Sequence, residues 1–126
     1  MKIKFIFILS LTTTLCVAQQ TVNIIPQPVS IQQQSGNFIL TGNTAIQYNP
    51  QQKGLKKVAK FFNLQLKNTT GFVLPVNTSL PATIQLSIEK LATIGDEGYN
   101  MDITSKAVTI KANTTAGIVY GIQSLL

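Results

Sequence analysis

Histidine, arginine and tryptophan are absent from this sequence of 126 residues, and its single cysteine is Cys16. Without histidine or a second cysteine, the chain lacks the nitrogen and sulfur ligands that usually hold zinc and other soft metals. A lone cysteine also excludes a disulfide within one chain. We therefore predict no metal-binding residues, no cofactor-binding residues, no cofactor and no thiol chemistry.

Acidic residues are scarce as well, and the formal net charge is +6. Ten lysines face four carboxylates, which are Glu89, Asp96, Glu97 and Asp102. Nucleic-acid-binding proteins usually cluster arginine with lysine and aromatic residues, because the guanidinium group grips phosphates and guanine edges. Since arginine is missing, we interpret the basic charge as a contribution to solubility and predict no nucleic-acid partner.

Long apolar runs are also missing, and the longest extends from Phe5 to Ala18 after Lys2 and Lys4. A positive start followed by a short apolar run is typical of a secretory signal peptide. The run has 14 residues, whereas a membrane-spanning helix needs about 20. The pattern therefore favours a cleaved leader over a permanent transmembrane helix.

We predict cleavage after Ala18, which gives a signal peptide at residues 1–18 and a mature domain at residues 19–126. A lipoprotein signal at Cys16 is the alternative, but Leu15 stands where such signals carry a small residue. The expected location is the periplasm or the exterior, without membrane association once the leader is removed.

Most of the mature chain alternates apolar and polar residues, which is the period of a strand with one buried face. The alternating apolar positions are Phe38 and Leu40; Ile46 and Tyr48; Phe72, Leu74 and Val76; Ile84, Leu86 and Ile88; Tyr99, Met101 and Ile103; Val108, Ile110 and Ala112. The segment Thr104–Lys106 separates the last two runs, so it predicts a hairpin loop.

One segment, Gln51–Lys67, has helical spacing instead, with Pro50 at its start and Gly71 beyond its end. Its apolar residues share one face: Leu55, Val58, Ala59, Phe62 and Leu66. Its lysines lie largely on the other face: Lys53, Lys56, Lys57, Lys60 and Lys67. We interpret the lysines as a solvated face rather than as a site for an acidic partner.

A second helix is predicted after Asn113, which we take as its N-cap. Its apolar stripe comprises Ala116, Val119, Tyr120 and Ile122. Gly117 and Gly121, one turn apart, should let another part of the backbone approach closely, with the Tyr120 ring at a buried seam. Because the helix reaches Leu125-Leu126 without a capping glycine, we expect it to be cut rather than finished.

The order of strands, helix, strands and helix predicts an α+β fold with two layers. We expect a mostly antiparallel or mixed β-sheet with the two helices packed on one face. A single small domain of this size leaves no room for a barrel enzyme.

Several segments carry a resemblance to a known family. They are Ile24–Pro28, Gly36–Leu40, Thr44–Ile46, Gly95–Ile103, Val108–Ala112 and Ala116–Leu125. Together they resemble the non-catalytic N-terminal domain that precedes the catalytic barrel in bacterial family 20 glycoside hydrolases, the β-N-acetylhexosaminidases. The resemblance implies an accessory domain whose partner is the catalytic barrel of the same polypeptide, expected beyond residue 126.

In that family the barrel carries an Asp–Glu pair, and the N-acetyl group of the substrate acts as the nucleophile. Because the barrel positions do not occur here, we predict no catalytic residues in this chain. Two alternatives remain open. One is a free-standing exported carbohydrate-binding or surface-adhesion module, against which the absence of tryptophan counts, and the other is the equivalent domain of another glycoside hydrolase family.

The tripeptide Gly95-Asp96-Glu97 matches the sequence around the catalytic pair of the family, but no histidine precedes it. It lies at the start of a predicted strand, so we interpret Asp96 and Glu97 as a turn or an interdomain contact. Three Asn-x-Ser/Thr sequons, at Asn68, Asn77 and Asn113, predict surface loops.

Overall fold

The computed structural model describes residue 24 and residues 28–126, so the predicted signal peptide and Cys16 lie outside the described part. The elements of the described part follow one another as β1 (Thr44–Tyr48), α1 (Leu55–Thr70), β2 (Ala82–Ile88), β3 (Tyr99–Ile103), β4 (Ala107–Ala112) and α2 (Thr115–Leu125). This order confirms the predicted α+β class.

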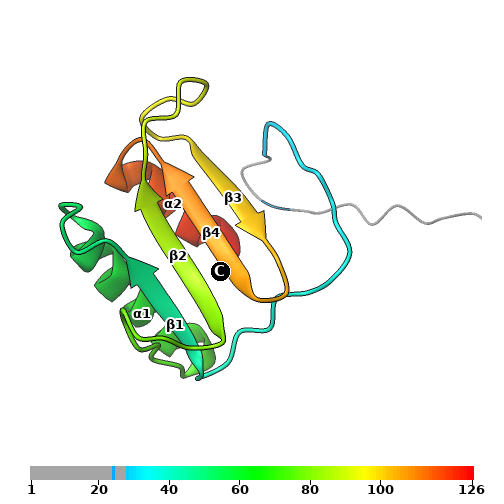
Figure 1. Ribbon diagram of the computed structural model, residues 1–126, viewed down its shortest axis with the longest axis vertical. Helices are drawn as coiled ribbons and strands as arrows, with labels where there is room; N and C mark the ends of the chain where they lie inside the picture. Colours follow the sequence, from blue (N-terminus) through cyan, green and yellow to red (C-terminus); the bar gives the residue numbers. More distant parts are fainter. Residues whose placement is uncertain (1–23, 25–27) are drawn as a thin grey trace, which may run out of the picture.

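The strands form one sheet in the order β1-β2-β4-β3 (Figure 1). Strand β2 pairs in parallel with both β1 and β4, whereas β3 pairs antiparallel with β4. Of the two sheet types expected, the mixed one is therefore correct. The parallel β1–β2 pair arises because α1 carries the chain back across the sheet between the two strands.

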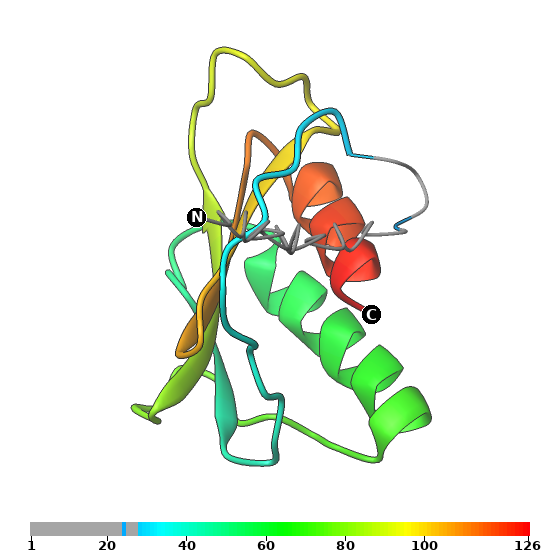
Figure 2. The ribbon, with the colours of Figure 1, turned by 90° about the vertical axis from the view of Figure 1, so that its right-hand side faces the viewer.

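Both helices lie on one face of the sheet, as predicted, and no helix of the described residues covers its other face, which we call the uncovered face (Figure 2). The core lies between the two layers and comprises Ile46, Leu55, Val58, Ala59, Phe62, Leu66, Leu74, Ile84, Leu86, Val108, Ile110, Ala112, Ile118 and Ile122. The predicted apolar face of α1 is buried in full. The hairpin at Thr104–Lys106 is also confirmed, since Thr104 N–H donates to the carbonyl of Ala107 at 2.8 Å.

Two predicted strands do not form. Phe38 and Leu40 pack against the core from an irregular segment. In the Phe72–Val76 segment, the Asn63 amide accepts from Leu74 N–H and donates to the Leu74 carbonyl, at 2.8 and 2.9 Å. Because a side chain takes these backbone groups and Pro75 has no N–H, only a single bridge forms, between Val76 and Ile46.

Helix α1 begins four residues later than the predicted start at Gln51. Gly54 has a left-handed backbone (φ 92°), and Pro50 belongs to the turn before it. The helix then continues past Lys67 to Gly71, also left-handed (φ 78°), whose N–H donates to the Lys67 carbonyl. The predicted role of Gly71 in ending the helix is thus confirmed.

Helix α2 differs from the prediction in its cap and in its buried face. Thr114, not Asn113, is the N-cap, and its hydroxyl accepts from Gly117 N–H at 3.4 Å. The residues buried against the sheet are Gly117, Ile118, Gly121 and Ile122. Of the predicted stripe only Ile122 is fully buried, and Tyr120 is exposed instead of lying in a buried seam. The two glycines account for which side of α2 is buried, because without side chains they allow the helix to approach the sheet closely on their side.

Candidate functional site

The Asp96-Glu97 pair lies in a turn, closed by a 3.2 Å hydrogen bond from Gly98 N–H to the Gly95 carbonyl. Both residues are exposed. The Thr114 hydroxyl donates to the Asp96 carbonyl and so ties the turn to the start of α2. The predicted turn is confirmed. A general acid works in an enclosed site beside the bond that breaks, whereas this turn is open to solvent.

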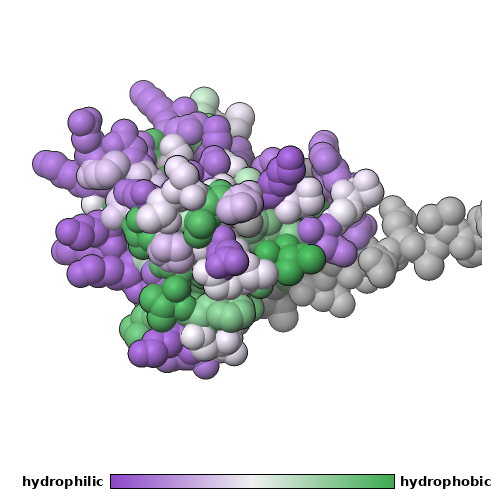
Figure 3. Space-filling model, turned by 60° about the horizontal axis from the view of Figure 1, so that its bottom comes forward, coloured by the Kyte–Doolittle hydropathy of each residue, from purple (hydrophilic) through white to green (hydrophobic). Residues whose placement is uncertain are grey.

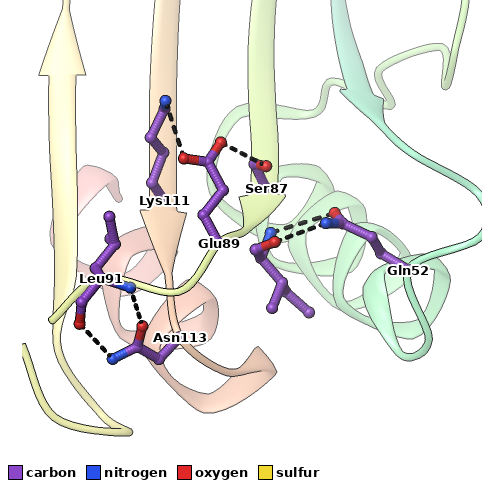
Figure 4. Close-up of polar contacts among 7 residues, drawn as sticks. Gln52, Ser87, Glu89, Leu91, Lys111 and Asn113 are labelled. Atoms are coloured by element: carbon purple, nitrogen blue, oxygen red, sulfur yellow. Dashed lines mark hydrogen bonds and ion pairs between the residues drawn. The ribbon is translucent and has the colours of Figure 1, made fainter.

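Asn113 holds the connection between β2 and β3 in place (Figure 4). Its side-chain oxygen accepts from Leu91 N–H at 2.6 Å, and its nitrogen donates to the carbonyls of Leu91 at 3.0 Å and Ile94 at 2.6 Å. This role explains why Asn113 does not cap α2. We found no sequence signal for it, because the partners are about 20 residues away in the chain.

The sequons do not all lie in surface loops as predicted. Asn77 does, in an exposed segment with a left-handed backbone (φ 53°). Asn68 belongs to the last turn of α1. Asn113 is half-buried, and its amide nitrogen is already engaged. The Asn77 prediction is therefore confirmed and the Asn68 prediction is wrong. Asn113 lies in the loop between β4 and α2, as predicted, but is half-buried rather than at the surface.

Two further polar contacts lie at the end of β2 (Figure 4). The Gln52 amide donates to the Ile88 carbonyl at 2.7 Å and accepts from Ile88 N–H at 3.2 Å. Glu89 accepts from Lys111 at 3.2 Å and from the Ser87 hydroxyl at 3.0 Å. The hydrogen bond from Lys111, together with that from Ser87, lowers the pKa of the Glu89 carboxyl below its ordinary value.

The uncovered face of the sheet carries a shallow, open hollow of about 520 Å³. Its lining includes Gln47, Gln85, Ser87, Thr109 and Lys111. Its single aromatic residue, Tyr48, is half-buried and packs against the core. Binding sites for small molecules and sugars usually present apolar or aromatic surface beside their polar groups. The hollow therefore adds no support for a free-standing carbohydrate-binding module.

The side of α2 that points away from the sheet exposes an aromatic ring and carries no charge. We call it the outer α2 face; it comprises Ala116, Tyr120 and Gln123, which are exposed and follow helical spacing opposite the buried residues. Val119 beside them is half-buried and packs against the core. Tyr120 is 44% exposed, and α2 contains no charged residue at all. An exposed aromatic ring on a helix without charged residues is typical of a contact surface, so this face fits a contact with another body.

Two further findings concern the described residues only. None of their helices is long and apolar enough to cross a bilayer. Nor do they contain a group of three or more His, Cys, Asp or Glu side chains that could hold a metal ion.

Comparison with known proteins agrees with the resemblance. Residues 21–126 match the family model described as glycosyl hydrolase family 20, domain 2. The structure is similar to the β-N-acetylhexosaminidase of Streptomyces coelicolor (30% identity, TM-score 0.72) and to the β-hexosaminidase of Streptomyces plicatus (30% identity, TM-score 0.71). Each likeness covers 81% of this chain but 20% of the other protein.

A curated relative, the lacto-N-biosidase of Bifidobacterium bifidum, is 30% identical over 69 residues. These make up 55% of this chain and 6% of that protein. The chain thus spans a small part of each relative.

Proposed function

We propose that this chain, which belongs to the domain family called glycosyl hydrolase family 20, domain 2, is an accessory, non-catalytic domain. In this proposal it packs against a catalytic barrel of the same polypeptide and stabilises that barrel. The barrel removes terminal N-acetylhexosamine residues, and the whole protein acts in the periplasm or outside the cell. The solved relatives support the pairing, since this chain accounts for 20% of each of them.

The observation that carries the proposal is the outer α2 face. Tyr120 presents an exposed aromatic ring on a helix without charges, whereas the outward side of α1 carries lysines. Tyrosine is among the residues that contribute most to binding at protein interfaces, because it buries a large apolar area and keeps a polar tip. We infer that the barrel contacts the helix layer at α2 rather than at the lysines of α1.

A charge placed on the outer α2 face tests this interface. In a full-length protein that contains this domain, Tyr120→Glu should destabilise the domain–barrel contact by about 2 kcal/mol, the lower bound for a strong interface residue. The measurement is thermal unfolding of the full-length protein and of this chain alone. We expect a lower melting temperature in the former and little change in the latter, since Tyr120 is exposed there.

The control is Gln85→Glu, which adds the same charge on the uncovered face of the sheet, where Gln85 is exposed. It should leave both melting temperatures unchanged. If Tyr120→Glu destabilised the isolated chain as much as the full-length protein, the outer α2 face would not be the contact and the proposal would lose its support.

A further inference from the structure

The positive charge of this domain is strongly segregated. Residues 28–88 contain no aspartate or glutamate, since the first acidic residue of the chain is Glu89. They contain five lysines, all exposed, on α1 or in the turn before it. We call them the lysine face: Lys53, Lys56, Lys57, Lys60 and Lys67. Across residue 24 and residues 28–126 the single ion pair joins Lys111 and Glu89, so the lysine face has no internal counter-charge.

Apart from Lys67, which lies in the last turn of α1 and complements the helix dipole, this arrangement does not stabilise the helix. Lys56 and Lys60 are four residues apart on α1, a spacing at which like charges repel. No acidic side chain lies in the first turn of α1, where one would favour the helix dipole. The described residues therefore supply no counter-charge to these lysines, and an anionic partner would come from outside them.

Exposed apolar side chains accompany the lysines. Leu64 is 58% exposed and lies one helical turn after Lys60 and three residues before Lys67, within the same arc of α1. Directly after the helix, Phe72 is 38% and Val73 60% exposed. Hydrophobic side chains bordered by hydrophilic ones are visible at this end of the molecule (Figure 3). A soluble polyanion offers no apolar surface against which these side chains could be buried. The boundary between lipid headgroups and acyl chains can bind lysines and bury apolar side chains at the same time.

We propose that the lysine face, with Leu64 and Val73, binds the surface of an anionic lipid bilayer. The contact is peripheral, with the ammonium groups near the headgroups and the apolar side chains at the acyl boundary. This surface is on α1 and is separate from the outer α2 face, so it goes beyond the proposed function. It also replaces the expectation that the exported domain does not associate with membranes.

Vesicle co-sedimentation tests the proposal directly. The probes are vesicles of phosphatidylcholine alone and vesicles with phosphatidylglycerol as the anionic lipid, mixed with the chain recovered after export and checked by intact mass. Each lysine near an anionic surface contributes about a fivefold factor to partitioning. Lys56→Gln with Lys60→Gln should therefore weaken binding to the anionic vesicles about 25-fold. Binding should also fall as salt is raised from 0.01 to 0.5 M, since salt screens the surface potential.

The matched control is Lys90→Gln with Lys106→Gln, which removes the same charge from exposed positions outside the lysine face. It should retain most of the binding, and Leu64→Ser should weaken it at unchanged charge. Equal binding to the two kinds of vesicle, or equal loss in the two double variants, would overturn the proposal. So would retention on a soluble polyanion such as dextran sulfate without any binding to vesicles.

Discussion

Gly117 and Gly121 let α2 lie directly against the chain around β3 and β4. A β-carbon at Gly121 would come within 2.6 Å of the Ile110 side chain and 3.2 Å of the Tyr99 ring. At Gly117 it would collide with the Gly98 carbonyl oxygen, which is backbone and cannot move aside like a flexible side chain. The close approach inferred from their spacing is thus present, and two small residues determine which side of the helix is buried.

Gly117→Ala should therefore destabilise the domain. Alanine favours a helix by up to about 1 kcal/mol over glycine, but overpacking against backbone costs about 1–3 kcal/mol, so a net loss is expected. Chemical denaturation of the chain measures it. Gly95→Ala is the control, because no atom lies within 4 Å of the added carbon and the backbone there is not left-handed. A Gly117→Ala variant as stable as the parent would contradict the packing described.

Glu89 gives a prediction about pH. Its hydrogen bonds to Lys111 and Ser87 lower the pKa of the carboxyl in the folded state. A lowered folded-state pKa adds stability that is present above the unfolded-state pKa and is lost as the pH falls through the folded-state value. Since both partners are well exposed, we expect this contribution to be small.

An NMR titration of the Glu89 carboxyl should therefore give a midpoint below that of an ordinary glutamate, about 4.3. Lys111→Gln should move the midpoint back up, because it removes the largest cause of the shift. Lys106→Gln, which removes a lysine that makes no ion pair with Glu89, should leave it in place. If the titration midpoint of Glu89 were unchanged in Lys111→Gln, the ion pair would not persist in solution.

At the scale of the elements, the connection between β2 and β3 depends on Asn113. Asn113→Ala should free Leu91 N–H and the Leu91 and Ile94 carbonyls, at a cost of about 1–3 kcal/mol for half-buried polar groups left without a partner. In this variant, amide hydrogen exchange at Leu91 should become faster, whereas exchange in β4 should change less. Asn68→Ala is the control, since Asn68 is exposed in α1 and alanine is favoured there. Unchanged exchange at Leu91 would contradict the role given to Asn113.

Element prediction succeeded where the local pattern matched the tertiary surroundings. Strands β2 and β4 keep their alternating apolar residues against the core, and all five apolar residues predicted on α1 are buried. Strand β3 does so with Tyr99 and Met101, whereas Ile103 at its end is exposed. It failed at Phe72–Val76, where the same alternation occurs but the Asn63 side chain occupies the backbone groups of Leu74. Alternation describes which side chains can be buried, and it does not determine where the backbone finds its hydrogen bonds.

At the scale of the whole molecule, the isolated chain should not hydrolyse a nitrophenyl N-acetylglucosaminide. Sugar hydrolysis needs a proton donor held beside the bond that breaks in an enclosed site, and Asp96 and Glu97 are exposed in a turn. Release of nitrophenol measures it. In a full-length protein, Glu97→Gln should leave turnover nearly unchanged, whereas loss of the glutamate of the barrel should abolish it. Turnover by the purified chain that disappears with Glu97→Gln would make this turn the active site.

The sequence by itself determined the α+β class, the helix at α1, the hairpin between β3 and β4 and the family resemblance. These depend on residue periods, turn residues and ordered motifs, all of which are local in the chain. Only the tertiary structure decided that β4 lies between β2 and β3, that two strand pairs are parallel, and that Tyr120 is exposed. Those features result from contacts between segments 20 or more residues apart, such as Asn113 with Leu91 and Gln52 with Ile88. Such contacts form only when the packed layers bring the segments together, so no local pattern of residues specifies them.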